Sequence, residues 1–574
     1  MSGNYTWFII DGIGPFFRGI ERHRVNWSKI PFGHVDACQL LDGPGFEQVV
    51  SDFETVCAKA AAAGYTAITL DDVAHLVPDD HYPPEMNRKI ERYRTTYRKL
   101  FAVAADYGLS ILITTDFMFR HPSLDPVLKR SWSRNLACFV RMNNRLLEDF
   151  PEIRGVILRV GESDAADAGG DFRSSLMVKS PAQARKLIAT LLPVFARHDR
   201  VLIFRTWSVG AYRVGDLIWN RDTYDRVFHG LEHPNLIISI KYGESDFFRY
   251  LPLSRQFFKG PHQKIVEFQA RREYEGCGEY PSFVGWDVAH YRAALESAPG
   301  MVGISVWCQT GGWAVFRRLT YLEDAGLWNE LNAYVIVQLF REGATVDGAL
   351  RSFYRQRFGE GRWDKWIELM ELSDQVIKEL LYVREFAERN MYFRRLRIPP
   401  LMTVFWDHLF VNHSMRKVLG CLVLDREASL REAARSMAAL DRMVVLAGEL
   451  GIRPQDIAFQ RQTFGLLAAA RDYYLRPYQP AFADRLTALK EAYQQAYRIR
   501  YAVKLDFRPV RIRRKWFRRF LGLLLRDHRR YRMLDHVFTI RILAGVYSVM
   551  RWLVPGLIPR FARERAMGLD VVFK

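Results

Sequence analysis

The stretch LIISIKYGESDFFR, which begins at Leu236, places four apolar residues among its first five and then turns abruptly polar. Lys241, Glu244 and Asp246 follow within six residues of each other. Paired carboxylates that face one another across a cleft can act as acid and base, which is the chemistry of glycosidic bond hydrolysis. The segment therefore predicts a strand that ends in an active site.

Other apolar runs of the chain end in a similar way. Arg159 and Glu162 close RGVILRVGESD, Arg205 and Trp207 close RVLIFRTWS, and Glu273 follows KIVEF. Arginine can bind a carboxylate through two parallel hydrogen bonds, and lysine supplies a point charge. Cations gathered beside carboxylates at these strand ends therefore predict an anionic substrate.

Charged residues at strand ends also form salt bridges that only close a barrel, and the sequence leaves this alternative open for each of them. Glu244 and Glu267 lie close to the favoured carboxylates, so their spacing does not exclude either as the true participant. Glu275 and Glu279 are expected to be solvated.

Eight short apolar runs, separated by helix-like segments, are the elements that would position these side chains. The runs begin near residues 7, 65, 109, 154, 200, 235, 264 and 302. Continuous apolar runs suit parallel strands that are covered on both faces. We therefore expect a (β/α)8 TIM barrel over residues 1–325, with its active site at the C-terminal strand ends. An open doubly wound sheet is the alternative, but no glycine-rich phosphate loop follows the first run.

From Leu327 onward the apolar residues recur with a helical period, which predicts an α-helical domain over residues 326–503. The tail, residues 504–574, holds 18 Lys and Arg against 5 Asp and Glu, and so carries +13 of the net charge of +19. Its basic clusters alternate with Trp, Phe and Leu, which indicates an amphipathic segment on an anionic membrane surface. A helical cap on the core is the alternative, and no recognised module supports nucleic-acid binding.

The composition sets further limits. A chain of 574 residues is expected to form two or three domains, and 49% apolar with 14% aromatic residues fits a packed globular protein. Six scattered cysteines without a CxxC or His/Cys cluster favour a reducing compartment and predict no structural zinc. No signal-peptide pattern is present at the N-terminus. The expected location is the cytoplasm, with the tail implying a peripheral position on the inner face of the membrane.

The order and spacing of several segments resemble the α-glucuronidases of glycoside hydrolase family 67. The resemblance begins at GIERHRVNW, from Gly19, and covers about residues 7–360. The other segments that carry it are AAAAGYTAITLDDV, LDPVLKRSW, RGVILRVGESD, LIFRTWSVG, NLIISIKYGESDFF, VEFQARREYEG and GLWNELNAYVIVQLF.

That family removes terminal α-linked glucuronic acid with inversion and without a metal, so the resemblance implies an enzyme that needs no cofactor. It implies that Glu162 is the general acid and that Asp246 and Glu273 form the base side, without deciding which of the two takes the proton. The family's helical domain often mediates dimers, which implies a homodimer. The substrate-binding residues that the resemblance implies are Glu21, Arg159, Arg205, Trp207 and Lys241.

The sequence also departs from the family. The family's N-terminal α/β domain has no counterpart here, Arg159 replaces a lysine, and the loop that holds Glu162 is one residue shorter. A uronate-bearing glycan other than xylan, such as an exopolysaccharide fragment, is therefore at least as well supported. The alternative function is that of a non-catalytic or lyase-type protein that acts on uronate glycans at the membrane surface, in exopolysaccharide assembly or turnover.

Overall fold

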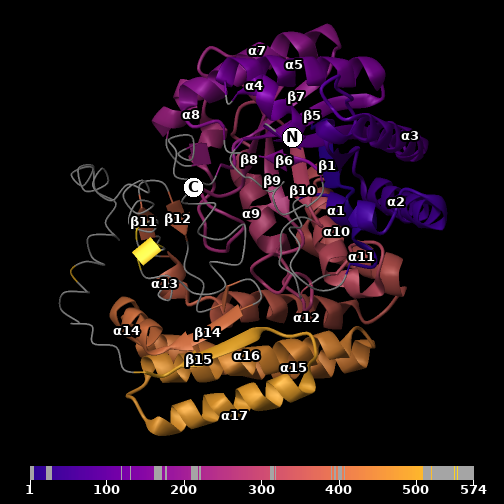
Figure 1. The fold of residues 1–574 in the computed structure, drawn as a ribbon. Helices are drawn as coiled ribbons and strands as arrows, with labels where there is room; N and C mark the ends of the chain where they lie inside the picture. Colours follow the sequence, from indigo (N-terminus) through magenta and orange to yellow (C-terminus); the bar gives the residue numbers. More distant parts are fainter. Residues whose placement is uncertain are drawn as a thin grey trace.

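The fold is a closed barrel of eight parallel strands, in the order β1-β10-β9-β8-β7-β5-β3-β2, as seen in the computed structural model (Figure 1). This confirms the predicted TIM barrel. Its strands are β1 (Trp7–Asp11), β2 (Ala67–Asp71), β3 (Ser110–Asp116), β5 (Ile153–Arg159), β7 (Val201–Arg205), β8 (Leu236–Lys241), β9 (Gln263–Gln269) and β10 (Met301–Trp307). The structure describes residues 5–20, 29–117, 119–129, 131–160, 171–174, 177–208, 217–218, 221–309, 316, 318–388, 391–393, 396–398, 404–405 and 408–508, with a few residues of the tail.

Helices surround the strands and cover their outer faces. They are α1 (Phe32–Ala37), α2 (Gly43–Ala63), α3 (Pro84–Asp106), α4 (Asp125–Leu128), α5 (Trp132–Asp149), α7 (Pro181–Arg197), α8 (Arg221–Phe228), α9 (Gly285–Leu295) and α10 (Leu327–Arg341). Between β8 and β9, where every residue is described, a single 3-10 turn (Arg255–Phe258) replaces the helix of a regular β/α unit. The loop after β8 is therefore free to form part of the barrel mouth.

Local sequence fixes the ends of these helices. Gly64 ends α2 in the left-handed conformation, with φ of 109°, which costs glycine little because it has no Cβ. At the start of α7 the Ser180 hydroxyl accepts a hydrogen bond from the Gln183 backbone N–H, at 3.3 Å. Both are common helix-end arrangements.

The strands are mainly apolar because they are buried on both faces, and most of their charged residues stand at the C-terminal ends. All residues of β2 and β8 are buried. The side chains that point into the barrel form one apolar layer, to which seven of the strands contribute one residue each. That layer consists of Ile9, Ala67, Leu112, Ile157, Ile203, Ile237 and Ile265.

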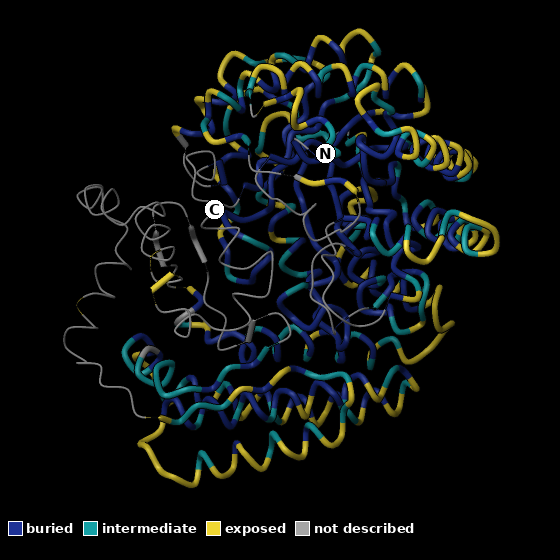
Figure 2. The backbone as a smooth tube through the Cα atoms, viewed as in Figure 1, coloured by how far each residue is buried: buried dark blue, intermediate teal, exposed yellow. Residues whose placement is uncertain are grey.

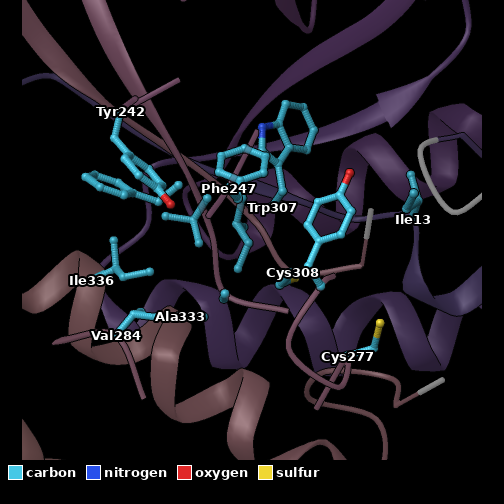
Figure 3. Packing of buried hydrophobic residues seen from close by; sticks show 14 of the residues in the cluster. Ile13, Tyr242, Phe247, Cys277, Val284, Trp307, Cys308, Ala333 and Ile336 are labelled. Atoms are coloured by element: carbon cyan, nitrogen blue, oxygen red, sulfur yellow. The ribbon is translucent and has the colours of Figure 1, made fainter. Parts of the chain in front are cut away.

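A larger apolar cluster joins the outer faces of the strands to the helices and continues into the C-terminal region. Figure 3 shows part of it, with Phe247 and Trp307 from the barrel and Ile336 from α10 in one cluster. In Figure 2 the strands and the inner faces of the helices are buried, and the exposed residues lie on the rim. The barrel and the helices that follow it therefore share one core.

The C-terminal region is mainly helical, as predicted, and lies against one side of the barrel (Figure 1). Its helices are α11 (Val346–Phe358), α12 (Trp363–Val376), a π-helical turn (Ile377–Leu381), α13 (Arg384–Glu388), α14 (His413–Leu422), α15 (Arg426–Leu450), α16 (Pro454–Leu475) and α17 (Pro480–Ala496). It also contains short strands that the sequence did not predict: β11 (Met391–Phe393), β12 (Leu396–Ile398), β13 (Val404–Phe405), β14 (His408–Asn412) and β15 (Ala502–Asp506).

The boundary expected between residues 503 and 504 falls inside β15, which pairs in parallel with β14. Nearly all of the tail beyond it lies outside the described residues, so its predicted contact with a membrane stays a prediction. Among the helices that the structure describes, none is both long enough and apolar enough to cross a membrane.

Candidate active site

Charged side chains line the C-terminal mouth of the barrel. Side chains two residues apart on a strand point to the same side, so a charged residue two positions after an interior residue also points into the barrel. Ile157 and Ile203 belong to the apolar layer of the interior. Arg159 and Arg205 lie two residues further along the same strands, and so face the same way one layer higher. The mouth is polar where the interior below it is apolar.

A buried ionic cluster occupies the part of the mouth formed by β2, β3 and β5. Lys29 is completely buried, forms an ion pair with Asp72, and lies 3.4 Å from a carboxylate oxygen of Asp116. Arg159 binds Asp116 through two hydrogen bonds, from Nε at 2.8 Å and from Nη2 at 3.0 Å. Burial raises the pKa of Asp71 to about 6, against the opposing charges of Lys29 and Arg159. Arg159 is therefore already paired with a carboxylate of the neighbouring strand.

Arg205 is paired in the same manner across the barrel interior. Its Nε lies 3.0 and 2.9 Å from the two carboxylate oxygens of Glu267. Glu267 is completely buried and also accepts hydrogen bonds from the Ser239 hydroxyl and, at 3.3 Å, from the Trp307 indole N–H. Glu267 was an open alternative for a reacting carboxylate, and its contacts make it the ion-pair partner of Arg205.

Lys241 and Asp246 form the third pair, at the end of β8. The Lys241 Nζ lies 2.6 Å from Oδ1 of Asp246 and 3.3 Å from the centre of the Trp207 ring. Asp246 also accepts hydrogen bonds from the Tyr274 hydroxyl at 2.8 Å and from the Phe247 backbone N–H at 2.9 Å. Burial alone would raise the pKa of Asp246, but Lys241 and these donors outweigh it and lower the pKa below its usual value. Asp246 is therefore ionised at neutral pH.

Asp246 and Glu273 are the accessible carboxylates of the described part of the mouth. The Asp246 side chain is 15% exposed and Glu273 is also partly exposed, whereas Glu244 and Glu267 are buried. Gln269 orients Glu273, since its amide donates to Glu273 Oε2 at 3.3 Å and its Oε1 accepts the Glu273 backbone N–H at 2.7 Å. Both carboxylates are therefore partly exposed at this end of the barrel.

The structure thus brings six of the predicted residues to one end of the barrel. They are Arg159, Arg205, Trp207, Lys241, Asp246 and Glu273. The other two predicted residues, Glu21 and Glu162, lie outside the described residues. The general-acid role of Glu162 therefore stays a prediction.

The expectation that Glu275 and Glu279 are solvated was wrong. Glu275 is completely buried, with its carboxylate 3.2 Å from Nε of Arg249 and in a second ion pair with Arg272. Glu279 is buried and lies 2.7 Å from a guanidinium nitrogen of Arg318. Arg249 and Arg318 are far from these glutamates in sequence, so the pairing exists only in the folded chain.

Glu275 makes the stability of the fold depend on pH. Burial would raise its pKa, but Arg249 and then Arg272 outweigh burial and lower the pKa from 4.5 to about 2. A carboxyl whose pKa is lower in the folded state stabilises the fold above pH 4.5, and this contribution is lost as the pH falls through 2. We expect about 3 kcal/mol to disappear over this interval. Urea unfolding between pH 2 and 6 should show a shallower pH dependence for Glu275→Gln than for the wild type, and equal slopes would contradict the assignment.

Sequence reasoning missed the ionic cluster of Lys29, Asp72 and Asp116. A signal was available, because LDDV and TTDF both place aspartates at the end of an apolar run, as Lys241 stands at the end of LIISI. The role of Tyr274 was also missed. The residues around it give no sign of this role, because its hydrogen-bond partner, Asp246, lies 28 residues away in the sequence.

The arrangement is suited to acid–base chemistry carried out by carboxylates. Within the described ranges, no group of three His, Cys, Asp or Glu side chains is placed to hold a metal ion. The mouth offers an ionised carboxylate with a lysine and an indole beside it, and a second accessible carboxylate one strand away.

No family model matches the sequence, and no curated protein matches it. Several solved structures are similar in fold. A GH138 enzyme targeting pectin rhamnogalacturonan II is 12% identical, with a TM-score of 0.48, over 87% of this chain and 63% of its own, so the chain spans less than two thirds of that protein. CpGH84B is 10% identical, with a TM-score of 0.41, over 86% of this chain and 74% of its own.

An O-GlcNAc hydrolase of Thermobaculum terrenum is 12% identical, with a TM-score of 0.38, over 89% of this chain and 96% of its own. Likeness at these identities concerns the fold alone and assigns neither a substrate nor a reaction to this chain. The resemblance to family 67 remains a prediction from the sequence.

Proposed function

We propose that the chain is a glycoside hydrolase that releases a terminal α-linked uronic acid from an oligosaccharide or polysaccharide, with inversion. The observation that carries the proposal is the pair of partly exposed carboxylates, Asp246 and Glu273, which follow the neighbouring strands β8 and β9, with the Lys241 ammonium beside Asp246. Hydrolysis at the mouth of a TIM barrel needs a carboxylate base of this kind, a carboxylic acid for the leaving oxygen, and a means to orient the sugar.

In this proposal Asp246 activates the attacking water. It is ionised at rest, and three donors fix its carboxylate: Lys241, Tyr274 and the Phe247 backbone N–H. Glu273 lies on the adjacent strand end and helps to position the water. Glu162, supported by the sequence resemblance, protonates the leaving oxygen. Inversion requires a distance of roughly 6.5–9.5 Å between acid and base carboxyl groups, which leaves room for the water.

Lys241 is the residue proposed to recognise the uronate carboxylate. An ammonium has three N–H donors, and Asp246 takes one of them in the described contacts. Arg159 and Arg205 are already paired with Asp116 and Glu267, so a uronate that bound either guanidinium would have to do so alongside that carboxylate. The Trp207 ring, which contacts Lys241, supplies an apolar face for the sugar ring.

The Lys241→Met variant tests the choice of substrate. We expect the ratio of kcat/KM for an α-glucuronide to that for the matching α-glucoside to fall roughly 10- to 100-fold, which is the effect of losing one charged hydrogen bond. Because both substrates are measured on the same variant, the loss of the ion pair to Asp246 affects both and cancels in the ratio. An unchanged ratio would assign uronate recognition to another residue.

The proposal as a whole is tested with a panel of uronate-capped oligosaccharides that includes xylan and exopolysaccharide fragments. Release of free uronic acid by the purified full chain supports hydrolysis. An unsaturated product would identify a lyase, and saturable binding without any product would identify a glycan-binding protein.

A further inference from the structure

The loop after β8 carries, three residues beyond Asp246, an arginine that connects the barrel to the helical region. Arg249 is 2% exposed. Its Nη1 donates to Asp287 of α9 at 2.6 Å and to Asp374 of α12 at 2.8 Å, and its Nη2 donates to the Phe283 carbonyl at 2.7 Å. Every side of the guanidinium is therefore fixed by a neighbouring element.

The loop after β9 carries a matching carboxylate two residues beyond Glu273. Glu275 accepts hydrogen bonds from Arg249 Nε, at 3.2 and 3.3 Å, and from Arg272 Nε, at 3.0 Å. It also accepts a hydrogen bond from the hydroxyl of Tyr382 at 2.9 Å. The loops that hold Asp246 and Glu273 are thus joined to each other through one buried ion pair.

Tyr382, which directly follows the π-helical turn of the helical region, contacts both loops. Its hydroxyl donates to Glu275 and accepts the backbone N–H of Arg249 at 3.2 Å. Its own carbonyl accepts a hydrogen bond at 2.8 Å from Arg471, a completely buried residue of α16. A single hydroxyl therefore bonds one loop through a carboxylate and the other through its backbone.

The two loops need such support because their backbone is strained. Tyr250, Arg272 and Cys277 have φ values of 61°, 54° and 51°, in the left-handed region that residues with a Cβ rarely adopt. Strained residues of this kind persist only where the surrounding structure fixes them, and they concentrate at functional sites. All three lie within a few residues of Asp246 or Glu273.

We propose that Tyr382 is a positioning residue: the helical region, through the Tyr382 hydroxyl and the Arg249–Glu275 pair, holds the loops that place Asp246 and Glu273. Its effect on turnover rests on the proposed hydrolase function, whereas its effect on the order of the two loops does not. The helical region is then part of the active-site machinery and not only a neighbouring domain.

The test compares Tyr382→Phe with Tyr493→Phe in the full chain. Tyr493 is also a buried tyrosine of the helical region whose hydroxyl accepts a backbone N–H, that of Tyr501, at 3.2 Å, and contacts a second side chain, Thr463, at 3.1 Å. Both variants lose one buried hydroxyl, but only the first loses contact with the loops. Hydrogen exchange measured by mass spectrometry follows the amides of residues 242–254 and 270–283, and kinetics on an α-glucuronide follow turnover.

We expect Tyr382→Phe to speed amide hydrogen exchange in both loops about tenfold, since it removes the hydrogen bonds that hold the two loops to the helical region. We expect kcat to fall about tenfold with little change in KM, because the reacting groups are less well placed. The acid limb of the pH profile should move to higher pH, since a looser Tyr274 stabilises the Asp246 anion less. Tyr493→Phe should show none of these effects.

Unchanged exchange in the two loops of Tyr382→Phe would overturn the proposal, whatever the activity. If exchange and turnover changed equally in both variants, the effect would be one of general stability, and the proposal would also fail. If the wild type released no uronic acid while Tyr382→Phe alone loosened the loops, the positioning role would stand and the hydrolase function would fall.

Discussion

The Asp246→Asn variant is expected to lose about 10³-fold in kcat while folding normally, because asparagine keeps the shape of the side chain but cannot accept the proton from water. The Phe247 backbone N–H can still donate to the amide oxygen in the place of Oδ1, and the Tyr274 hydroxyl can accept from the amide NH2 in the place of Oδ2. The side chain therefore stays in place, and the loss should appear in kcat more than in KM. Turnover on a uronate-capped oligosaccharide, together with the melting temperature, measures both.

Asp225→Asn is the matched control for this variant. Asp225 lies on α8, is 52% exposed and pairs only with the surface lysine Lys259 among the ion pairs described. Its replacement removes a carboxylate from an ion pair outside the mouth, and turnover should stay at the wild-type level. If Asp246→Asn kept more than about a tenth of wild-type kcat, Asp246 would not be the base.

The Lys29→Met variant is expected to destabilise the fold by about 3–5 kcal/mol, which is the usual cost of breaking a buried ion pair from one side. Lys29 is completely buried, and its ammonium faces Asp72 and Asp116 with Asp71 nearby. Without the cation these carboxylates remain buried with too little positive charge, which must either raise the pKa of Asp71 and Asp72 further or open the cluster to water. Urea unfolding at neutral pH measures the loss.

Lys264→Met is the matched control, because Lys264 is also completely buried but binds only carbonyl oxygens in the described contacts. Its replacement leaves acceptors without a donor but no unpaired buried charge, so its cost should be nearer 1–3 kcal/mol. Equal losses in the two variants would mean that the aspartates do not depend on Lys29 for their charge balance.

The barrel could be predicted from the sequence because its strands are buried on both faces. Runs such as LIISIK contain little but apolar residues. The polar residues that end these runs lie at the barrel mouth, and every second side chain along a strand points into the barrel. The turn that replaces a helix after β8 was less predictable, since RQFF also reads as part of a helix, and the short strands β14 and β15 pair across about 90 residues.

The site was predictable only where a side chain follows directly from its strand. Glu273 and Glu275 show the limit, since they are two residues apart and differ completely in environment. Glu275 is buried because Arg249, 26 residues away, and Tyr382, 107 residues away, meet it in the fold. Likewise, Arg159 and Arg205 were expected to bind substrate, and the carboxylates that hold them, on other strands, are visible only in the structure.

Proton NMR of the first minutes of the wild-type reaction on an α-linked uronate substrate tests the proposed inverting hydrolase most directly. The β-anomer of the free uronic acid should form first, before mutarotation supplies the α-anomer, and Asp246→Asn should form neither at a comparable rate. An α-anomer as the first product would show retention and remove the role of Asp246 as a base that activates water. An unsaturated uronate would show elimination and overturn hydrolysis itself.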